Sequence, residues 1–365
     1  MRLLLDSRAY LWWLMDHRSL PSAARQAIAQ SDSVVFVSAA TIWELAIKQQ
    51  LGRLRVEDAD LVAEIAENDL TGITFTTQHY AVYTTLDEPL ILMQAPVFLE
   101  SAFRSYAALL DDPVLQSEKF PVYLFLDRQQ WAKFTRFWAG PAAPILLKIQ
   151  SGAYYFKGAC VAWHLGRSSD FSVLAHEGWH QFSHQLFKYR LPAWLDEGIA
   201  TQFETHHKKN GRIVFSPRLN GSRLAGLKLT QENDAMLRLS NLIRVDAGHV
   251  ISQTTDKPKG NLDDPKVLAY YAQLYGFVRY LREGNFGAHR NTFRRMLNDA
   301  RQGRRWPLSP EQKTIALNKK SNPSRRWNEQ VGELVFRSYI APHADEVESP
   351  YQTFCRKITR YITLK

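Results

Sequence analysis

The sequence predicts an α+β protein in two unlike parts, an α/β segment over residues 1–73 and a larger part over 74–365 that is mainly helical towards its carboxyl end. Three observations support this prediction. Strand and helix patterns alternate up to about residue 73, and the alternation then stops. Residues 1–73 hold seven Lys and Arg against ten Asp and Glu, a net charge of −3. Because the whole chain has a net charge of +10, residues 74–365 have a net charge of +13. After residue 170 the text reads mainly as helices separated by loops.

The elements of the first part follow from short apolar runs and their boundaries. RLLLD at 2–6 is an apolar run ending in an acid, which predicts a buried strand that brings Asp6 to its carboxyl end. The next segments predict helices over 9–16 and 21–30, a strand over 34–39 and a helix over 41–52 that Gly52 ends. Alternating strands and helices favour a parallel sheet.

The larger part divides into a strand and helix region over 74–170 and a mainly helical region over 171–365, which contains the candidate site residues described below. In order, the pattern predicts a strand from 73 to 86, a helix over 96–110, a strand over 120–127, a helix over 128–138 and a strand pair over 152–165. Loops are expected over 211–221, 256–265 and 321–327.

The composition fits a globular chain with sizeable cores and no disulfide framework. Hydrophobic residues make up 45% and aromatic residues 12% of the 365 residues. Cys160 and Cys355 are the two cysteines, too few for a disulfide scaffold or a four-thiolate metal site. Asp6 interrupts the first apolar run, which is wrong for a secretory signal, and no apolar stretch is long enough to cross a bilayer. We therefore expect a cytoplasmic chain without a transmembrane segment.

Two basic clusters, over 290–305 and 319–326, could attract an anionic partner. Neither cluster interleaves aromatic residues in a pattern suited to base stacking. We expect a solvated basic face and no nucleic-acid partner.

The segment FSVLAHEGWHQFSHQLF carries the most informative motif of the chain, H-E-x-x-H, formed by His176, Glu177 and His180. Helix positions four apart lie about 40° from eclipsed, so both imidazoles project from one face and can grip one ion. A chance match is expected on the order of 0.02 times in such a chain. The apolar residues around the motif predict a buried helix, in which histidines need partners.

A catalytic zinc needs three protein ligands and an open position for water, so a third ligand is required downstream. In LPAWLDEGIATQFE, Pro192 marks a helix start and Glu197, 17 residues after His180, can aim back at the histidine pair. Asp196 is expected to point away from Glu197 on this helix. The remaining candidates are expected at the surface or in support of the ligands: His184, His206 and His207. Two neutral imidazoles and a carboxylate suit Zn²⁺ better than Mg²⁺ or Ca²⁺.

HEGWHQF followed by LPAWLDEGIATQFE strongly resembles the gluzincin branch of the zincins, the thermolysin-like clan, in which a second helix supplies a Glu ligand. The segments TTQHYAVYTTL, FPVYLFLDRQQW and YYAQLYGFVRYLREG extend the resemblance to a bacterial gluzincin-type family over about 75–365. The resemblance implies a zincin-like metallopeptidase domain in which His176, His180 and Glu197 bind Zn²⁺. It further implies that Glu177 acts as general base and acid while a peptide or protein substrate is hydrolysed.

Further roles are implied by the same resemblance. Gluzincins often add a Tyr or His that stabilises the oxyanion, and Tyr271, or its neighbours Tyr270 and Tyr275, is placed to do so. Glu204 lies on one helical face with Glu197 and is expected to orient a ligand histidine. Thermolysin-like enzymes commonly place an Asp four residues beyond the Glu ligand, whereas this chain has Thr201, so that support cannot simply be copied. Aromatic residues in a helix are more often core than catalytic.

MRLLLDSRAYLWWL and VFVSAATIWELAIKQQLGRL resemble the first half of a VapC-type PIN-domain ribonuclease toxin, in which a ring of acids gathers Mg²⁺. The matching acids are Asp6 and Glu44. The text that should supply the other acids is replaced after about Ile73, and two carboxylates hold Mg²⁺ weakly. We expect a truncated PIN-like segment whose acids are vestigial.

Two other functions remain open beside a zinc metallopeptidase. One is a Mg²⁺-dependent PIN-type endoribonuclease toxin, which would need the missing acids. The other is a non-catalytic zinc-binding protein, which would need a changed motif or a closed metal site.

Overall fold

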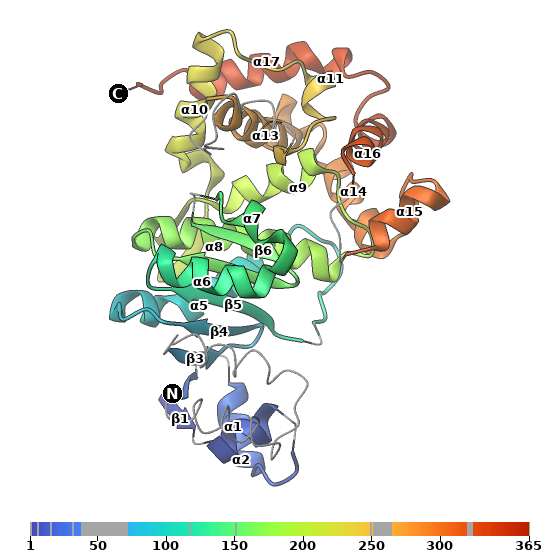
Figure 1. Ribbon diagram of the computed structural model, residues 1–365. Coiled ribbons are helices and arrows are strands. Elements are labelled where there is room, and N and C mark those ends of the chain that lie inside the picture. Colours follow the sequence, from blue (N-terminus) through green and yellow to red (C-terminus); the bar gives the residue numbers. More distant parts are fainter. Residues whose placement is uncertain are drawn as a thin grey trace. The chain divides into compact units, whose positions relative to one another are not determined.

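The chain forms a mixed α+β fold whose carboxyl-terminal part is mainly helical, as the sequence predicts (Figure 1). It divides into two compact units, and the division runs through the helices Pro89–Ala107 and Arg167–Leu186. The first unit comprises Met1–Ser101, Gln116–Leu147 and Gly152–Leu174, and the second comprises Ala102–Leu115, Lys148–Ser151 and Ala175–Lys365. The computed structural model describes residues 2–5, 7–14, 17–30, 33–37, 72–116, 118–149, 152–248, 250, 265–319 and 324–364.

The amino-terminal elements follow the alternation expected from the sequence. Strands β1 (Arg2–Leu5) and β2 (Val34–Val37) pair in parallel, which confirms the expected parallel arrangement. Helices α1 (Ser7–Leu14) and α2 (Ser22–Ala29) lie between them in the chain. Their small core contains Leu5, Tyr10, Leu20 and Ile28. The expected helix over 41–52, together with Asp6 and Glu44, lies outside the described residues.

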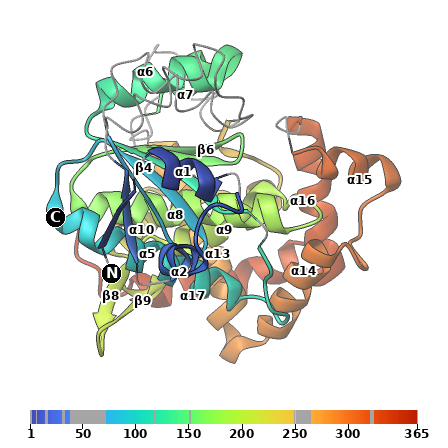
Figure 2. The same cartoon turned by 90° about the horizontal axis from the view of Figure 1, so that it is seen from below.

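A five-stranded sheet in the order β3-β4-β5-β7-β6 forms the centre of the first unit. β4, β5 and β7 run parallel, and the edge strands β3 and β6 are antiparallel to their neighbours. Helices α6 and α7 lie on one face, and the amino-terminal parts of α5 and α8 lie on the other (Figure 2). Because both faces are covered, β7 is buried along its whole length. The bounds are β3 Ile73–Thr76, β4 Tyr80–Thr84, α5 Pro89–Ala107, β5 Phe120–Phe125, α6 Arg128–Ala139, η2 Gly140–Ala142, α7 Ala143–Leu146, β6 Ala153–Phe156 and β7 Ala159–Trp163.

The strand expected from 73 to 86 is a hairpin of β3 and β4. The chain reverses after Thr77, whose hydroxyl accepts a hydrogen bond from the Tyr80 backbone N–H at 3.1 Å. Glu100 of α5 holds the turn, because its carboxylate accepts the backbone N–H of His79 at 2.8 Å and lies 2.7 Å from the Nδ1 atom of the same residue. The partner that fixes this turn is therefore distant in sequence.

Helix α5 begins at Pro89, so the expectation that it begins at Pro96 is wrong. Proline is tolerated at a helix start, whereas inside a helix it removes one backbone hydrogen bond. The interior Pro96 is accepted because the helix buries a continuous apolar face. Buried residues at helical spacing along it include Ile91, Ala95, Phe98 and Ala102.

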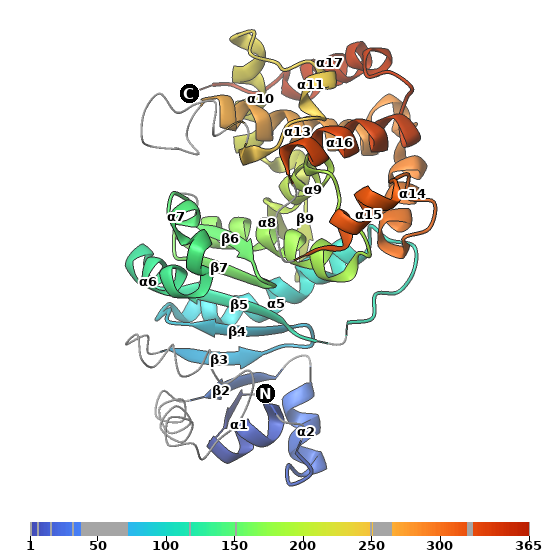
Figure 3. The same cartoon turned by 45° about the vertical axis from the view of Figure 1, so that its right-hand side comes forward.

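The second unit is built around α13, a long helix that contacts α9, α10, α14 and α17 (Figure 3). Nearly all of its residues from Ala269 to Leu281 are buried. Among the described residues, no helix is both long and apolar enough to span a membrane. The bounds are α8 Arg167–Leu186, α9 Ala193–Ala200, η3 Thr201–Phe203, η4 Pro217–Leu219, α10 Gly221–Glu232, α11 Leu239–Leu242, α13 Pro265–Glu283, η5 Asn285–Gly287, α14 Arg290–Gln302, α15 Pro310–Leu317, α16 Arg325–Tyr339 and α17 Asp345–Thr359.

The loop expected over 211–221 is partly ordered as a hairpin, which corrects that expectation. Strand β8 (His206–Lys209) pairs antiparallel with β9 (Arg212–Phe215). The turn residues Asn210 and Gly211 both have positive φ, 51° and 74°. This is the backbone that two-residue hairpin turns require, and Asn-Gly is its strongest sequence signal.

Candidate metal centre

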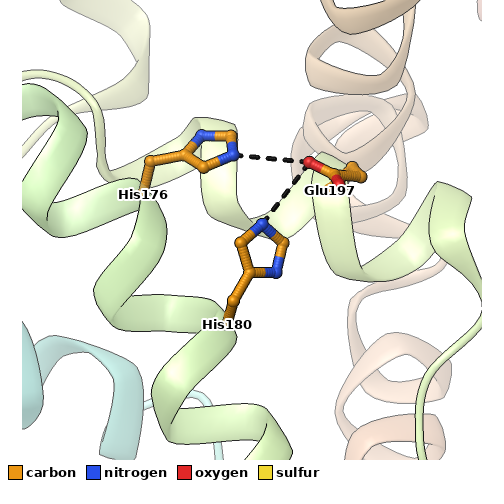
Figure 4. A group of neighbouring side chains, drawn as sticks. All are labelled: His176, His180 and Glu197. Atoms are coloured by element: carbon orange, nitrogen blue, oxygen red, sulfur yellow. Dashed lines mark ion pairs between the residues drawn. The ribbon is translucent and has the colours of Figure 1, made fainter. Parts of the chain in front are cut away.

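Two histidines of α8 and one glutamate of α9 point towards one another (Figure 4). The Oε2 atom of Glu197 lies 3.3 Å from Nε2 of His176 and 3.4 Å from Nε2 of His180. The three atoms all lie within 4.8 Å of one another, and among the described residues this is the group that could hold a metal ion. The histidine side chains are 13% exposed and that of Glu197 is 21% exposed, so the group is largely shielded yet reachable from solvent.

Helix α9, which carries Glu197, packs closely against α13. Gly198 makes this possible: a Cβ atom at its position would lie 2.5 Å from Cγ2 of Val278 and 3.1 Å from the carbonyl oxygen of Leu274. Real Cβ atoms essentially never approach other atoms below 3.0 Å, so a larger residue would push the two helices apart. The glycine after Glu197 thus allows α9 to lie close to α13.

The far nitrogen of each ligand histidine meets a carboxylate. Nδ1 of His176 lies 2.9 Å from Oε1 of Glu204, and Nδ1 of His180 lies 3.0 Å from Oδ2 of Asp196. Because an ionised carboxylate only accepts hydrogen bonds, we assign the proton of each neutral ring to Nδ1. Both Nε2 lone pairs are then bare and directed at the group. Such carboxylate partners fix the orientation of metal-binding histidines.

The Oε2 atom of Glu197 is buried and has no hydrogen-bond partner among the described residues. The atoms nearest to it in the group are the Nε2 atoms of His176 and His180, at 3.3 Å and 3.4 Å. A buried carboxylate oxygen without a donor is costly. A cation bound between the three atoms would satisfy all of them at once.

The electrostatics of the group favour positive charge. Burial lowers the pKa of His176, but Glu197 and Glu204 outweigh it and raise that pKa to about 9. The pKa of His180 is likewise raised well above 6.5, against burial, by Glu197 and Asp196. Burial raises the pKa of Glu197, yet the two imidazoles hold it below its usual range. Protons and a metal ion therefore compete for the same nitrogens.

Asp196 was expected to point away from Glu197, and its carboxylate lies at the other nitrogen of His180. Its carboxylate accepts hydrogen bonds from Nε1 of Trp179 at 2.8 Å and from Oγ of Ser183 at 2.9 Å, besides its contact with His180. Successive helix residues point about 100° apart. That divergence brings Glu197 to one nitrogen of His180 and Asp196 to the other.

Glu204 follows the short turn η3 and lies beside His176. Its Oε2 atom accepts hydrogen bonds from Nδ2 of Asn220 at 2.9 Å and from Nε of Arg223 at 2.8 Å. Burial would raise the pKa of Glu204, but Arg223 and His176 lower it to about 2. Thr201 is buried and donates its hydroxyl to the carbonyl of Gly198 at 2.7 Å, so the support for His176 comes from Glu204.

Of the three candidate tyrosines, Tyr271 lies beside the group. Its ring centroid is 6.2 Å from that of His176. Tyr270 donates its hydroxyl to the Val245 carbonyl at 3.3 Å, and Tyr275 donates to the Pro217 carbonyl at 2.7 Å. Burial first, and then charges that include Glu197 and Glu177, raise the pKa of Tyr271 well above 10. Its hydroxyl is therefore a proton donor at neutral pH.

The other histidines take no part in this group. His184 and His206 are half-buried and have lowered pKa values, to about 3 for His184, mainly because of burial. Nδ1 of His207 is buried without a hydrogen-bond partner among the described residues. Comparisons of the chain with protein-family models, with curated proteins and with solved structures found no match.

Proposed function

We propose that this protein is a zinc-dependent metallopeptidase whose metal is held by His176, His180 and Glu197. The convergence of their three ligand atoms supports the proposal most directly. A tetrahedral ion with ligand bonds of about 2.0–2.1 Å holds its ligand atoms about 3.3–3.4 Å apart. The Glu197 oxygen lies 3.3 Å and 3.4 Å from the two histidine nitrogens. Three protein ligands also leave a fourth position for water, as catalytic sites do.

The residues around the group fit peptide hydrolysis. When bound, zinc would lower the pKa of a water molecule and polarise a scissile carbonyl. Glu177 follows His176 on α8, and its charge raises the pKa of both His176 and Tyr271, so it acts within the site without belonging to the ligand group. Its carboxylate accepts a proton from the attacking water and donates it to the leaving amine nitrogen. The Tyr271 hydroxyl donates a hydrogen bond to the carbonyl oxygen as negative charge develops there.

The test compares metal content and peptidase activity in four variants of the full chain. His176→Ala and Glu197→Ala should lose metal and activity. Glu177→Gln should keep close to one zinc per chain and lose hydrolysis of an unfolded protein substrate. His206→Ala, the same kind of substitution outside the group, should keep both.

Each outcome distinguishes the proposal from its competitors. If Glu177→Gln and His176→Ala lose metal alike, the division between ligand and proton shuttle is wrong. If the unchanged chain binds zinc but hydrolyses no peptide, a non-catalytic zinc-binding protein is the better description. If no zinc is retained after reconstitution, the metal site itself is refuted.

A further inference from the structure

A single arginine, Arg223 of α10, grips the carboxylate that supports one ligand histidine. Its Nε atom donates to Oε2 of Glu204 at 2.8 Å and its Nη2 atom donates to Oε1 at 2.6 Å. Two parallel bonds of this kind fix the plane of the carboxylate as well as its position. Because Oε1 of Glu204 also meets Nδ1 of His176 at 2.9 Å, the arginine sets the direction of that contact.

The same guanidinium touches the tyrosine beside the group. The Cζ atom of Arg223 lies 5.1 Å from the centre of the Tyr271 ring, within the range of a cation–π contact. Tyr271 comes from α13, whereas Glu204 follows α9. One side chain from a third helix therefore holds two groups that act at the metal centre.

The two ligand histidines are supported by different chemistry. Asp196, the partner of His180, accepts its other hydrogen bonds from Trp179 and Ser183, which are neutral donors. Glu204, the partner of His176, is held by a cation. Both oxygens of Glu204 contact Arg223, Oε1 also meets Nδ1 of His176, and Glu204 is not part of the ligand group, so that it supports the ligand instead of becoming one.

We propose that Arg223 is a positioning residue of the metal centre, which orients His176 through Glu204 and holds the Tyr271 ring beside it. The inference rests on the proposed metal function. Lysine would keep the charge at this position but would lose both the planar fork and the flat face that lies over the ring. Arg223→Lys therefore separates geometry from charge.

The chain supplies a matched control in Arg279. Its Nε and Nη2 atoms donate to Glu283 at 3.3 Å and 3.0 Å, and its Cζ atom lies 5.5 Å from the centre of the Tyr275 ring. It repeats the pairing of arginine, glutamate and tyrosine without a ligand histidine. Arg279→Lys reports what the loss of such a contact does to the fold alone.

The experiment measures zinc affinity by chelator competition, and the visible absorption of the Co²⁺-substituted protein, in the full chain. Arg223→Lys should weaken zinc binding about 10-fold and change the Co²⁺ spectrum, because a support of this kind contributes about 10–100-fold in metal affinity. Arg279→Lys should change neither. Circular dichroism shows which variants are folded.

To decide whether Arg223 acts through Glu204, Arg223→Lys is also made in a chain that carries Glu204→Gln. Glu204→Gln should itself weaken zinc binding, and adding Arg223→Lys to it should weaken it little further. Equal effects of Arg223→Lys in both backgrounds, or an unchanged affinity and spectrum, would overturn the inference while leaving the metallopeptidase proposal intact. Absence of zinc binding by the unchanged chain would instead refute that proposal.

Discussion

Gly178, between the two ligand histidines, allows a quantitative test of how tightly α8 is packed. A Cβ atom at this position would lie 2.8 Å from the hydroxyl oxygen of Tyr106 and 3.6 Å from its Cε2 and Cζ atoms. That hydroxyl donates to the carbonyl of Ala175 at 2.7 Å. Tyr106 is fully buried, and its ring packs edge-on against Trp179 and Phe203, so it has no room to move away.

The expected magnitudes follow from these contacts. Gly178→Ala gains about 1 kcal/mol of helix propensity but costs about 1–3 kcal/mol through overpacking. Tyr106→Phe removes the clashing oxygen and loses one hydrogen bond, about 1 kcal/mol. In the Tyr106→Phe background, Gly178→Ala should therefore stabilise the protein by about 1 kcal/mol, because the nearest remaining atoms lie at an ordinary contact distance.

Urea unfolding of the four proteins in this double-mutant cycle measures the coupling, which should be about 1–3 kcal/mol. Gly226→Ala in α10 is the matched control, since its Cβ atom would meet only the Ala272 Cβ atom, at 3.4 Å. It should raise the free energy of unfolding whether or not Tyr106 is changed. If Gly178→Ala has the same effect in both backgrounds, the close contact with Tyr106 does not limit this position and the reasoning fails.

Three further outcomes are expected. Asp196→Asn should weaken zinc binding about 10–100-fold in chelator competition because it disturbs the orientation of His180, and an unchanged affinity would contradict the role given to Asp196. Burial raises the pKa of Glu100, but hydrogen bonds from His79 and Thr77 outweigh it and lower that pKa. The ionised carboxylate therefore stabilises the folded protein above the pKa of about 4.3 that Glu has in the unfolded chain, and this stabilisation is lost as the pH falls through the pKa of Glu100 in the folded protein. Glu100→Gln should therefore cost about 1.5–3 kcal/mol in urea unfolding at pH 7 and little in strong acid, and an equal cost at both would speak against an ionised Glu100. Residues 74–365 expressed alone should fold and bind zinc while residues 1–73 alone should be unstable; aggregation of the longer piece, or Mg²⁺-dependent RNA cleavage that Asp6→Ala abolishes, would contradict this.

The elements that local signals define were predicted well. Helix α6 begins at Arg128 as expected, because Asp127 caps it by accepting the Gln130 backbone N–H. Strands β6 and β7 were expected as a pair, and the turn between them has positive φ at Lys157 and Gly158, as a two-residue hairpin requires. In these places a few neighbouring residues determine the conformation.

The elements that were missed depend on distant partners or on competing signals. The β3–β4 turn depends on Glu100, and its sequence alone reads as continuous strand. Pro96 has the appearance of a helix start, and the burial that keeps it inside α5 is a tertiary effect. The β8–β9 hairpin is a different case, because the Asn-Gly signal was present in the sequence and was read as part of a loop.

The candidate site divides in the same way. The spacing of His176 and His180 follows from helix geometry, and the helix start at Pro192 places Glu197. The position of Asp196 depends on how α8 crosses α9, which no local pattern encodes. Arg223 lies 19 residues beyond Glu204, and nothing in its sequence context distinguishes it from other helical arginines.

The imidazole of His180 faces consecutive residues of one helix with its two nitrogens: Asp196 lies 3.0 Å from Nδ1 and Glu197 lies 3.4 Å from Nε2. Both of these contacts therefore require one particular alignment of α8 against α9. A shift of one helix by a single residue would exchange or remove both contacts. A flip of the ring would exchange its two nitrogens between Asp196, which supports the ring, and Glu197, which belongs to the ligand group. The contacts of this one side chain therefore depend on the alignment of α8 and α9. A longer or shorter turn between the two helices would change the contacts of the His180 ring.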